Sequence, residues 1–512
     1  MGGLGCGSSE PPSIISKPKI QTLSSLPSGR VLWHEWASRD SARVLRRPIF
    51  LFIYSRRSNW CREMAVRCFQ DRELARNLSQ GTFAIRIDAD RRPDLVDRFG
   101  LGGLPTNVFL TPDEQWITGG TYLDPSDLWD LFRRVRIYID VPERMEDLER
   151  EREYLKTHLI QESRGKSNLP ISPSLELLER AADSIRASMK IGVLPNAETL
   201  HFAINFGDQI GSGNLPAMCM GLLDRMSSDH PCDRDGLYYS ATRTPDDVVY
   251  DYEKRLDYNV SLLEVLSTAV GKNPKYRKLA EDLGSAIQHR LSDGTLFCAG
   301  FAGFREPIVS GEPGDFPRDP NVYTSGNALA VSAFAALSSA TEDSELLAFA
   351  SDLFGNLEER LQSPNGLYQT SDHDAGETLF LLADQALVAR AGLDLYAGSG
   401  DIQFLQAARK LADKVLKEFS SDSGALRDRI PEGGPDYSPA VDRWAPSGNG
   451  VAAQVLVRLY NLTGELKYQN VANSILTALI GPSIHRVSTL GALNRALAES
   501  LLKQPGEQRG NL

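Results

Sequence analysis

Cysteine is scarce in this chain of 512 residues, and no two of its six cysteines form a Cys-x-x-Cys pair. Scattered thiols of this kind are typical of proteins from reducing compartments, where disulfides are rare. Histidine is equally scarce, with seven residues and none paired at metal-ligand spacing. The sequence therefore predicts no metal site and no bound cofactor, and it favours a cytoplasmic location.

Long hydrophobic runs and excess positive charge are also missing. No segment approaches the roughly 18 uninterrupted apolar residues of a membrane-spanning helix. The formal net charge of −11 disfavours binding to nucleic acid or to acidic lipid surfaces. Residues 1–30 are rich in Ser, Gly and Pro and lack the apolar core of a secretory signal. We expect a disordered tail there, with an organellar targeting peptide as the alternative.

The chain is too long for one ordinary core, and its sequence pattern changes near residue 140. Short apolar runs at 48–54 and 82–90 predict buried strands, and helical patterns begin near residues 59 and 125. The full order of elements is strand, helix, strand, helix, strand, strand, helix. This order predicts one small α/β domain over residues 31–140.

A Trp-Cys pair, Trp60-Cys61, stands where the first long helix of this domain begins, and Pro105 precedes the third strand. This arrangement resembles the thioredoxin fold, in which the matching proline is cis and lies against two active-site cysteines. A cis X-Pro bond is uncommon and usually has a structural purpose. The sequence alone does not give the isomer of Pro105.

Three longer motifs follow one another in the same domain: SNWCREM at 58–64, DRRPD at 90–94 and GLPTNVFLTP at 103–112. They are similar to the motifs of the spermatogenesis-associated thioredoxin-like family, whose members join a thioredoxin-like domain to an α/α barrel. The resemblance covers the whole domain. It implies a degenerate and shortened member of that family.

The departures from the family pattern fall on its redox chemistry. Ser58 stands where the family has its first cysteine, and a hydroxyl does not form the thiolate that disulfide exchange requires. Cys68 is no substitute, because it lies about 10.5 Å along a helix from Cys61, whereas disulfide-linked Cα atoms lie within about 7 Å. We therefore expect no classical disulfide oxidoreductase activity. The degenerate redox site consists of Ser58, Trp60, Cys61 and Pro105.

Residues 141–170 are heavily charged and then rich in Ser, Gly and Pro, which is typical of a charged helical linker. From 171 to 505 helical periodicity dominates, and two series of short segments recur about every 60 residues. Nearly six such units predict six helical hairpins closed into an (α/α)6 barrel, with an open helical solenoid as the alternative. The first series holds the turn glycines Gly236, Gly294, Gly366 and Gly424, and the second holds the amides Asn259, Asn327, Gln385 and Asn449.

Partly eroded motifs in this region, such as SGN at 325–327 and PSGNGVAA at 446–453, are similar to those of the family's barrel. That barrel has the six-hairpin glycosidase-like fold, whose members place polar side chains from inner-helix starts around one mouth. The resemblance therefore implies a carbohydrate-active hydrolase or epimerase type of site. The paired catalytic histidines of the epimerase group are not recognisable, and His201 and His289 are interpreted as ordinary helix residues.

Sugar hydrolysis requires two carboxyl groups, and amides and aromatic rings suit sugar recognition. The catalytic candidates are Asp257, Asp384 and Glu253, and the ligand-binding candidates are Asn259, Asn327, Ser447, Asn449 and Trp444. Further groups at helix starts or turns are Asp251, Asp442, Tyr252, Tyr323 and His373. Asp, Ser and Asn at helix starts are equally typical of helix N-caps, so each candidate has a structural alternative.

The sequence thus favours a redox-inactive thioredoxin-like module joined to a barrel that binds or processes a carbohydrate-like small molecule. Two alternatives of other classes remain open. One is an interaction scaffold without turnover, and the other is a thiol-dependent protein that uses Cys61 alone or a thiol-independent chaperone.

Overall fold

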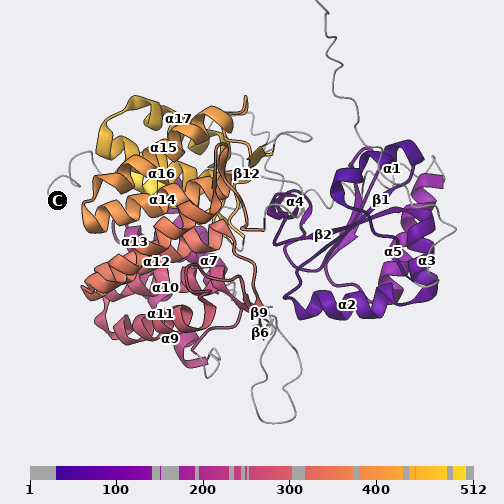
Figure 1. Cartoon of the computed structure of the whole chain (residues 1–512), viewed down its shortest axis with the longest axis horizontal. Coiled ribbons are helices and arrows are strands. Elements are labelled where there is room, and N and C mark those ends of the chain that lie inside the picture. The colour runs from indigo at the N-terminus through magenta and orange to yellow at the C-terminus, as the bar shows by residue number, and fades with distance from the viewer. Residues whose placement is uncertain are drawn as a thin grey trace, which may run out of the picture.

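A computed structural model describes residues 30–140, 150, 172–190, 195–229, 236–243, 248–250, 253–301, 318–372, 380–430, 437–443, 445–480 and 488–502. Nearly all of the expected tail at residues 1–30 and most of the expected linker at 141–170 lie outside these residues. The described chain forms an α/β domain beside a ring of helices (Figure 1).

The α/β domain is built on a four-stranded sheet in the order β2-β1-β3-β4. Strand β1 (Ile49–Tyr54) pairs in parallel with β2 (Phe83–Asp88) and antiparallel with β3 (Thr106–Leu110), which pairs antiparallel with β4 (Trp116–Gly120). Side chains alternate across the sheet because successive residues of a strand point to opposite faces. Phe50 and Phe52 therefore enter one core, and Ile49, Leu51 and Ile53 enter the other.

Helices cover both faces of this sheet. Helices α2 (Asn59–Phe69), α3 (Arg72–Gly81) and α5 (Pro125–Asp140) pack on the Phe50 face, and the other face packs against α4 (Pro93–Phe99). The short elements η2 (Trp36–Ser38) and α1 (Asp40–Leu45) precede β1. Helix α4 lies on the side of the domain that faces the barrel (Figure 1). This arrangement is the thioredoxin-like fold that the motifs implied.

Six helices form the inner ring of the barrel within the described residues. They are α8 (Ala197–Phe206), α10 (Leu256–Lys272), α12 (Thr324–Thr341), α14 (Leu382–Ser399), α16 (Gly448–Thr463) and α18 (Gly491–Leu502). Each contacts the next, and α18 returns to contact α8. The ring is closed, so the architecture is an (α/α)6 barrel and the open solenoid is excluded.

Six outer helices in the described chain alternate with the inner ones along the sequence. They are α7 (Leu175–Lys190), α9 (Leu215–Asp229), α11 (Arg277–Leu291), α13 (Ser344–Leu361), α15 (Ile402–Glu418) and α17 (Leu466–Ile480). The inner helices are apolar almost all round because neighbours cover every side, whereas outer helices such as α15 bury a single face.

Short strands line the end of the barrel at which the inner helices begin, which we call the mouth. Strand β8 (Gly300–Phe301) pairs there with β7 (Lys254–Arg255) and with β9 (Arg318–Asp319), and β12 (Phe380–Leu381) pairs with β13 (Arg429–Ile430). The remaining short strands are β5 (Ala241–Arg243), β6 (Val248–Tyr250), β10 (Gln362–Ser363) and β11 (Gly366–Leu367). The loops at this end carry the residues that meet the thioredoxin-like domain.

Candidate functional site

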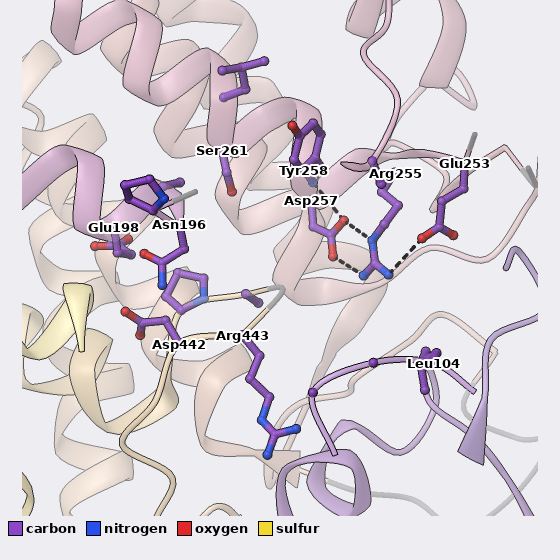
Figure 2. Close-up of a pocket in the computed structure, with 18 of the residues that line it drawn as sticks. Leu104, Asn196, Glu198, Glu253, Arg255, Asp257, Tyr258, Ser261, Asp442 and Arg443 are labelled. Atoms are coloured by element: carbon purple, nitrogen blue, oxygen red, sulfur yellow. Dashed lines mark hydrogen bonds and ion pairs between the residues drawn. The ribbon is translucent and has the colours of Figure 1, made fainter. Parts of the chain in front are cut away.

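A cavity of about 700 Å³ lies between the thioredoxin-like domain and the barrel mouth. One side, here called the thioredoxin wall, consists of Ser58, Trp60, residues 101–104, Thr121 and Tyr122. The opposite side, the barrel wall, includes Asn196, Glu198, Glu253, Arg255, Asp257, Tyr258, Glu264, Asp442 and Arg443. Figure 2 shows the side chains of Glu198, Glu253, Arg255, Asp257, Asp442 and Arg443 on the barrel side, with Leu104 on the facing loop.

Arg57 holds the two domains together at the edge of this region. Its guanidinium is buried and donates to the carbonyl oxygen of Ala299 in the barrel at 2.6 Å and to Asp90 of its own domain at 2.5 Å. Asp319 of the barrel lies 3.8 Å from its Nε. Gln369 of the barrel donates in return to the backbone oxygen of Asp90 at 2.9 Å. The DRRPD motif of residues 90–94 thus supplies part of the domain interface.

Helix α4 adds a second group of contacts to the interface. Arg429 of the barrel donates to Asp94 at 2.7 Å, and Tyr437 donates to the backbone oxygen of Asp97 at 2.6 Å. Arg443 lies 3.3 Å from the Asp97 carboxylate. Burial raises the pKa of Asp97 to about 6 even though Arg443 opposes the rise. Burial, followed by repulsion from Asp94, raises the pKa of Asp428 to about 7.

The residues predicted to form a degenerate redox site lie at the start of α2 and in the loop before β3. Ser58 occupies the N-cap position and lines the cavity, and its hydroxyl makes no hydrogen bond within the described residues. Cys61 is buried, and its sulfur accepts a hydrogen bond from the backbone N–H of Ser55 at 3.4 Å. The Leu104–Pro105 peptide bond is cis.

The described cysteines Cys61, Cys68, Cys219 and Cys298 are all free thiols, whereas Cys6 and Cys232 lie outside the described residues. Cys68 turns away from the redox site, because its thiol donates to the carbonyl oxygen of Leu123 at 3.4 Å. Burial raises the pKa of Cys68 to about 12. This thiol is therefore protonated near neutral pH and is a poor nucleophile.

The amides predicted to bind a ligand are instead bonded to the backbone of the barrel. Asn259 accepts from the N–H of Tyr238 at 2.8 Å and donates to its carbonyl at 3.0 Å. Asn327 makes the same pair of bonds with Phe297. In the later units, Gln385 pairs with Leu367 and Asn449 with Leu426 in the same way.

This pairing explains why two sequence series share one period. Each residue bonded by an amide follows one of the four turn glycines, whose φ angles lie between 82° and 132°. The amide of one inner helix therefore locks the turn that precedes it. Asn259, Asn327 and Asn449 are fully buried and bonded at both ends, so the structure places these predicted ligand contacts in the turns and not among the residues that line the main cavity. Ser447 serves as the N-cap of α16 by accepting from the N–H of Gly450 at 3.2 Å.

Two of the three catalytic candidates line the main cavity. Asp257 forms a bidentate pair with Arg255, at 2.9 and 2.6 Å. Although burial opposes ionisation, this arginine lowers the pKa of Asp257. Burial raises the pKa of Glu253 against the pull of Arg255, and its Oε2 has no hydrogen bond within the described residues. Glu253 therefore keeps one carboxyl oxygen available to a ligand.

Asp384 lies elsewhere, in a smaller cavity of about 160 Å³ beside the α4 interface. Burial raises its pKa well above the ordinary range despite a hydrogen bond from the backbone of Ser325. Asp257 lines both cavities. It therefore shares the main cavity with Glu253 and the smaller cavity with Asp384. Tyr323 lines the smaller cavity, whereas Asp251, Tyr252, His373 and Trp444 lie outside the described residues.

A charged network inside the barrel was missed by sequence reasoning. Arg390 is completely buried and donates to Glu198 at 2.5 Å and to Glu264 at 3.3 Å. Arg495 lies 3.5 Å from Glu198 and 3.6 Å from Glu264. His201, interpreted from the sequence as an ordinary helix residue, joins the network at 3.6 Å from Glu264. The available signal was a charged side chain within an otherwise apolar inner helix.

Glu198 and Asp442 are two cavity-lining carboxyls with opposite protonation behaviour. Burial would raise the pKa of Glu198, but Arg390 and Arg495 outweigh it and lower the value to about 2. Burial raises the pKa of Asp442 to about 7, and repulsion from Glu198 adds to this rise. Near neutral pH one carboxyl is thus ionised while the other exchanges its proton. Figure 2 shows both on the same side of the cavity.

Backbone groups fix the orientation of Asp442. Its two oxygens accept from the N–H of Ser447 at 2.8 Å and from that of Ala492 at 2.9 Å, at the starts of α16 and α18. Within the described residues, no cluster of His, Cys, Asp and Glu is placed to hold a metal ion. Among those same residues, no helix is long and apolar enough to cross a bilayer.

Comparison with known proteins supports the identity of the front domain. Residues 20–161 match the thioredoxin-like DsbH family, described as "Protein of unknown function, DUF255". Spermatogenesis-associated protein 20 of Homo sapiens is 37% identical over 106 residues, which is 19% of this chain and 13% of the human protein. The resemblance to that family is therefore confirmed for the thioredoxin-like part, and the match covers a small fraction of the human relative.

The barrel is similar to solved structures at low sequence identity. A family 105 glycoside hydrolase of C. acetobutylicum is 14% identical with a TM-score of 0.46, over 64% of this chain and 99% of that one. Cellobiose 2-epimerase from Bacillus thermoamylovorans is 13% identical with a TM-score of 0.42, over 63% and 84% of the two chains. The closed ring of inner helices remains the direct observation of the barrel fold.

Proposed function

We propose that this protein binds a carbohydrate-like ligand in the cavity between its two domains, and that the barrel wall carries the acid–base chemistry. The single observation that supports this most is the cavity itself, with carboxyl groups on one wall and aromatic rings on both. The thioredoxin-like module then serves as a redox-inactive wall. A scaffold without turnover would need no such cavity lined by several carboxyl groups.

The size and lining of the cavity suit a small sugar. Its volume of about 700 Å³ falls within the range of about 300–1,000 Å³ that is common for small-molecule sites. Trp60, Tyr122 and Tyr258 offer rings for the apolar face of a sugar, while the carboxyls and Ser261 offer partners for its hydroxyls.

The proposed chemistry uses Glu198 and Asp442. Cleavage of a glycosidic bond requires one carboxyl that delivers a proton and another that is ionised. The pKa of about 7 at Asp442 suits the first role at neutral pH, and the pKa of about 2 at Glu198 suits the second. Glu253 is a second candidate acid, because burial raises its pKa and one of its oxygens is unbonded.

Redox inactivity of the front domain is part of the same proposal. Ser58 supplies no thiolate, and Cys61 is buried, with its sulfur hydrogen-bonded to Ser55. We expect insulin reduction by the protein to remain at background and to be unchanged by Cys61→Ser. A cytoplasmic location is also proposed, supported by the four free thiols of the described residues and checked by cell fractionation.

The test is a thermal-shift and calorimetric screen of glucose, mannose, galactose, cellobiose and maltose. We expect at least one sugar to stabilise the wild type and to lose this effect with Glu198→Gln and with Asp442→Asn. Asp282→Asn is the matched control, because Asp282 pairs with Lys278 on the far surface of α11. If a sugar stabilises all variants equally, the binding site lies elsewhere. If no sugar binds the wild type, the proposal is rejected.

Turnover is then measured by incubating the wild type with cellobiose and maltose and assaying the release of reducing sugar. Activity is expected to fall as pH rises through about 7, because Asp442 then loses the proton that it would deliver. A flat pH profile would exclude Asp442 as the acid.

A further inference from the structure

We infer that Ser58 is a ligand contact and that the thioredoxin wall, although it has lost its redox couple, sets the specificity of the barrel site. This inference rests on the proposed function, because it assigns to the front domain a direct role in the same cavity. The thioredoxin wall consists of Ser58, Trp60, residues 101–104, Thr121 and Tyr122, as defined above.

The hydroxyl of Ser58 is buried and unsatisfied by the described protein. Ser58 is 2% exposed, its side chain lines the cavity, and its Oγ has no hydrogen-bond partner among the described residues. Most buried polar atoms in folded proteins have a partner, and an orphaned hydroxyl costs free energy. A bound ligand hydroxyl would supply the missing partner.

The position of Ser58 in α2 strengthens this argument. Ser58 is the N-cap residue, where a serine hydroxyl ordinarily accepts from an N–H of the first helical turn. Here it makes no such bond, although its backbone oxygen accepts from Arg62 at 3.3 Å in the usual way. The side chain therefore lines the cavity without capping its own helix.

The neighbours of Ser58 complete a surface without charged side chains. Trp60 and Tyr122 meet edge to face, with ring centroids 5.5 Å apart. The adjoining loop brings Leu104 to the cavity, as Figure 2 shows, and Gly102 in this loop has a φ of +91°, which favours glycine. An indole ring and a leucine side chain suit the C–H face of a sugar ring, while one hydroxyl of that ring meets Ser58.

The two walls together define the ligand class. The barrel wall contains four glutamate and aspartate side chains at the cavity besides the pair Arg255 and Asp257, whereas the thioredoxin wall contains no charged residue. A neutral sugar held between the walls would direct its hydroxyls to the carboxyls and its apolar face to Trp60. We expect sugars that lack the hydroxyl facing Ser58 to bind more weakly.

The experiment measures the dissociation constant of the sugar from the panel above that stabilises the wild type most, using the full chain. Ser58→Ala is expected to weaken binding about tenfold, which corresponds to about 1.4 kcal/mol. The unliganded melting temperature should not fall, because the hydroxyl has no protein partner to lose. Ser38→Ala is the control, since Ser38 is a serine of the same domain whose hydroxyl donates to Glu35 in an exposed position.

A second variant keeps the inference testable if Ser58→Ala rearranges locally. Trp60→Leu should also weaken binding of the same sugar, and single-deoxy analogues should identify one hydroxyl whose removal weakens wild-type binding but has no further effect on Ser58→Ala. If Glu198→Gln abolishes binding while both wall variants bind like the wild type, this inference fails and the proposed function stands. If no sugar binds the wild type, both fail together.

Discussion

The two walls of the interdomain cavity differ in charge. All the charged side chains that line it, including Glu198, Arg255 and Asp442, come from the barrel, and the thioredoxin wall contributes neutral groups around Ser58 and Trp60. The difference follows from what lies behind each wall. The barrel interior holds arginines that compensate buried carboxylates, whereas the thioredoxin wall is backed by an apolar core.

This contrast teaches how two carboxyls at one cavity come to differ in pKa. Buried counter-charges hold their protonation states apart, and Arg390 and Arg495 supply these for Glu198. A neutral wall needs only a fixed shape. The DRRPD segment and Arg57 provide that by fastening the thioredoxin-like domain to the mouth.

The largest expected loss of stability comes from removing a buried arginine that compensates the carboxylates of the barrel wall. Arg390→Met should lower the free energy of unfolding by about 3–5 kcal/mol, because Glu198 and Glu264 then lose their closest buried cation and share only Arg495. Urea denaturation followed by far-ultraviolet circular dichroism measures this loss. Arg409→Met is the control, since Arg409 pairs with Glu465 at the surface and should cost about 0–1 kcal/mol. Similar losses for both would contradict a structural role of the network.

The next effect concerns the amide locks that support the barrel mouth. Asn449→Ala should cost about 2–4 kcal/mol, because it leaves the backbone N–H and carbonyl of Leu426 without partners. The same denaturation experiment measures it. Asn356→Ala removes one exposed bond to Thr295 and should be nearly neutral. A nearly neutral Asn449→Ala would show that the turn is held by other contacts.

A smaller effect is expected where the neutral wall is fastened to the barrel. Arg57→Met should weaken docking of the domains at least tenfold, about 1.4 kcal/mol, because it removes the bond to Ala299 and leaves Asp90 without its cation. The readouts are a larger radius of gyration in small-angle X-ray scattering and faster proteolysis within residues 141–171. Arg56→Met is the neighbouring control, since Arg56 is exposed and its ion pair with Asp88, at 3.2 Å, lies within its own domain. Unchanged scattering with Arg57→Met would argue against this fastening role.

The smallest expected effect is a dependence of docking on pH. Burial raises the pKa of Asp428 to about 7 and that of Asp97 to about 6, whereas a solvated aspartate has a pKa of about 3.9. The docked state therefore binds more protons than the separated state between about pH 4 and 7, and docking weakens as pH rises through this window. Scattering at pH 5 and pH 8 measures the change. The double variant Asp97→Asn with Asp428→Asn should reduce it, and an opposite slope would contradict the assignment.

Sequence motifs and helical periodicity predicted the fold well, because each reflects what a single strand, helix start or turn requires of its own residues. The strands, the Trp60-Cys61 helix start and the proline loop follow from residue order within one domain. The turn glycines and the amides Asn259, Asn327 and Asn449 recur because each unit closes its turn in the same way. The sequence alone does not distinguish the two roles, since a buried amide serves a backbone turn as readily as it would serve a ligand.

The site was predicted less completely. Glu253 and Asp257 line the main cavity, whereas Asp384 lines a separate one, and the amides Asn259, Asn327 and Asn449 line neither. Glu198, Glu264 and Arg390 belong to three helices far apart in the sequence. No sequence motif links these three residues, because they form ion pairs only where the closed ring of helices brings their side chains together.

By itself, the sequence determined that a serine replaces the first cysteine of the redox motif and that helical hairpins recur about every 60 residues, since both are properties of local order. Only the tertiary structure decided that the face around Ser58 and Trp60 meets the barrel mouth, and which carboxyls have raised or lowered pKa values there. The physical reason is that burial and counter-charge act through space, so a protonation state depends on neighbours that the linear order does not specify.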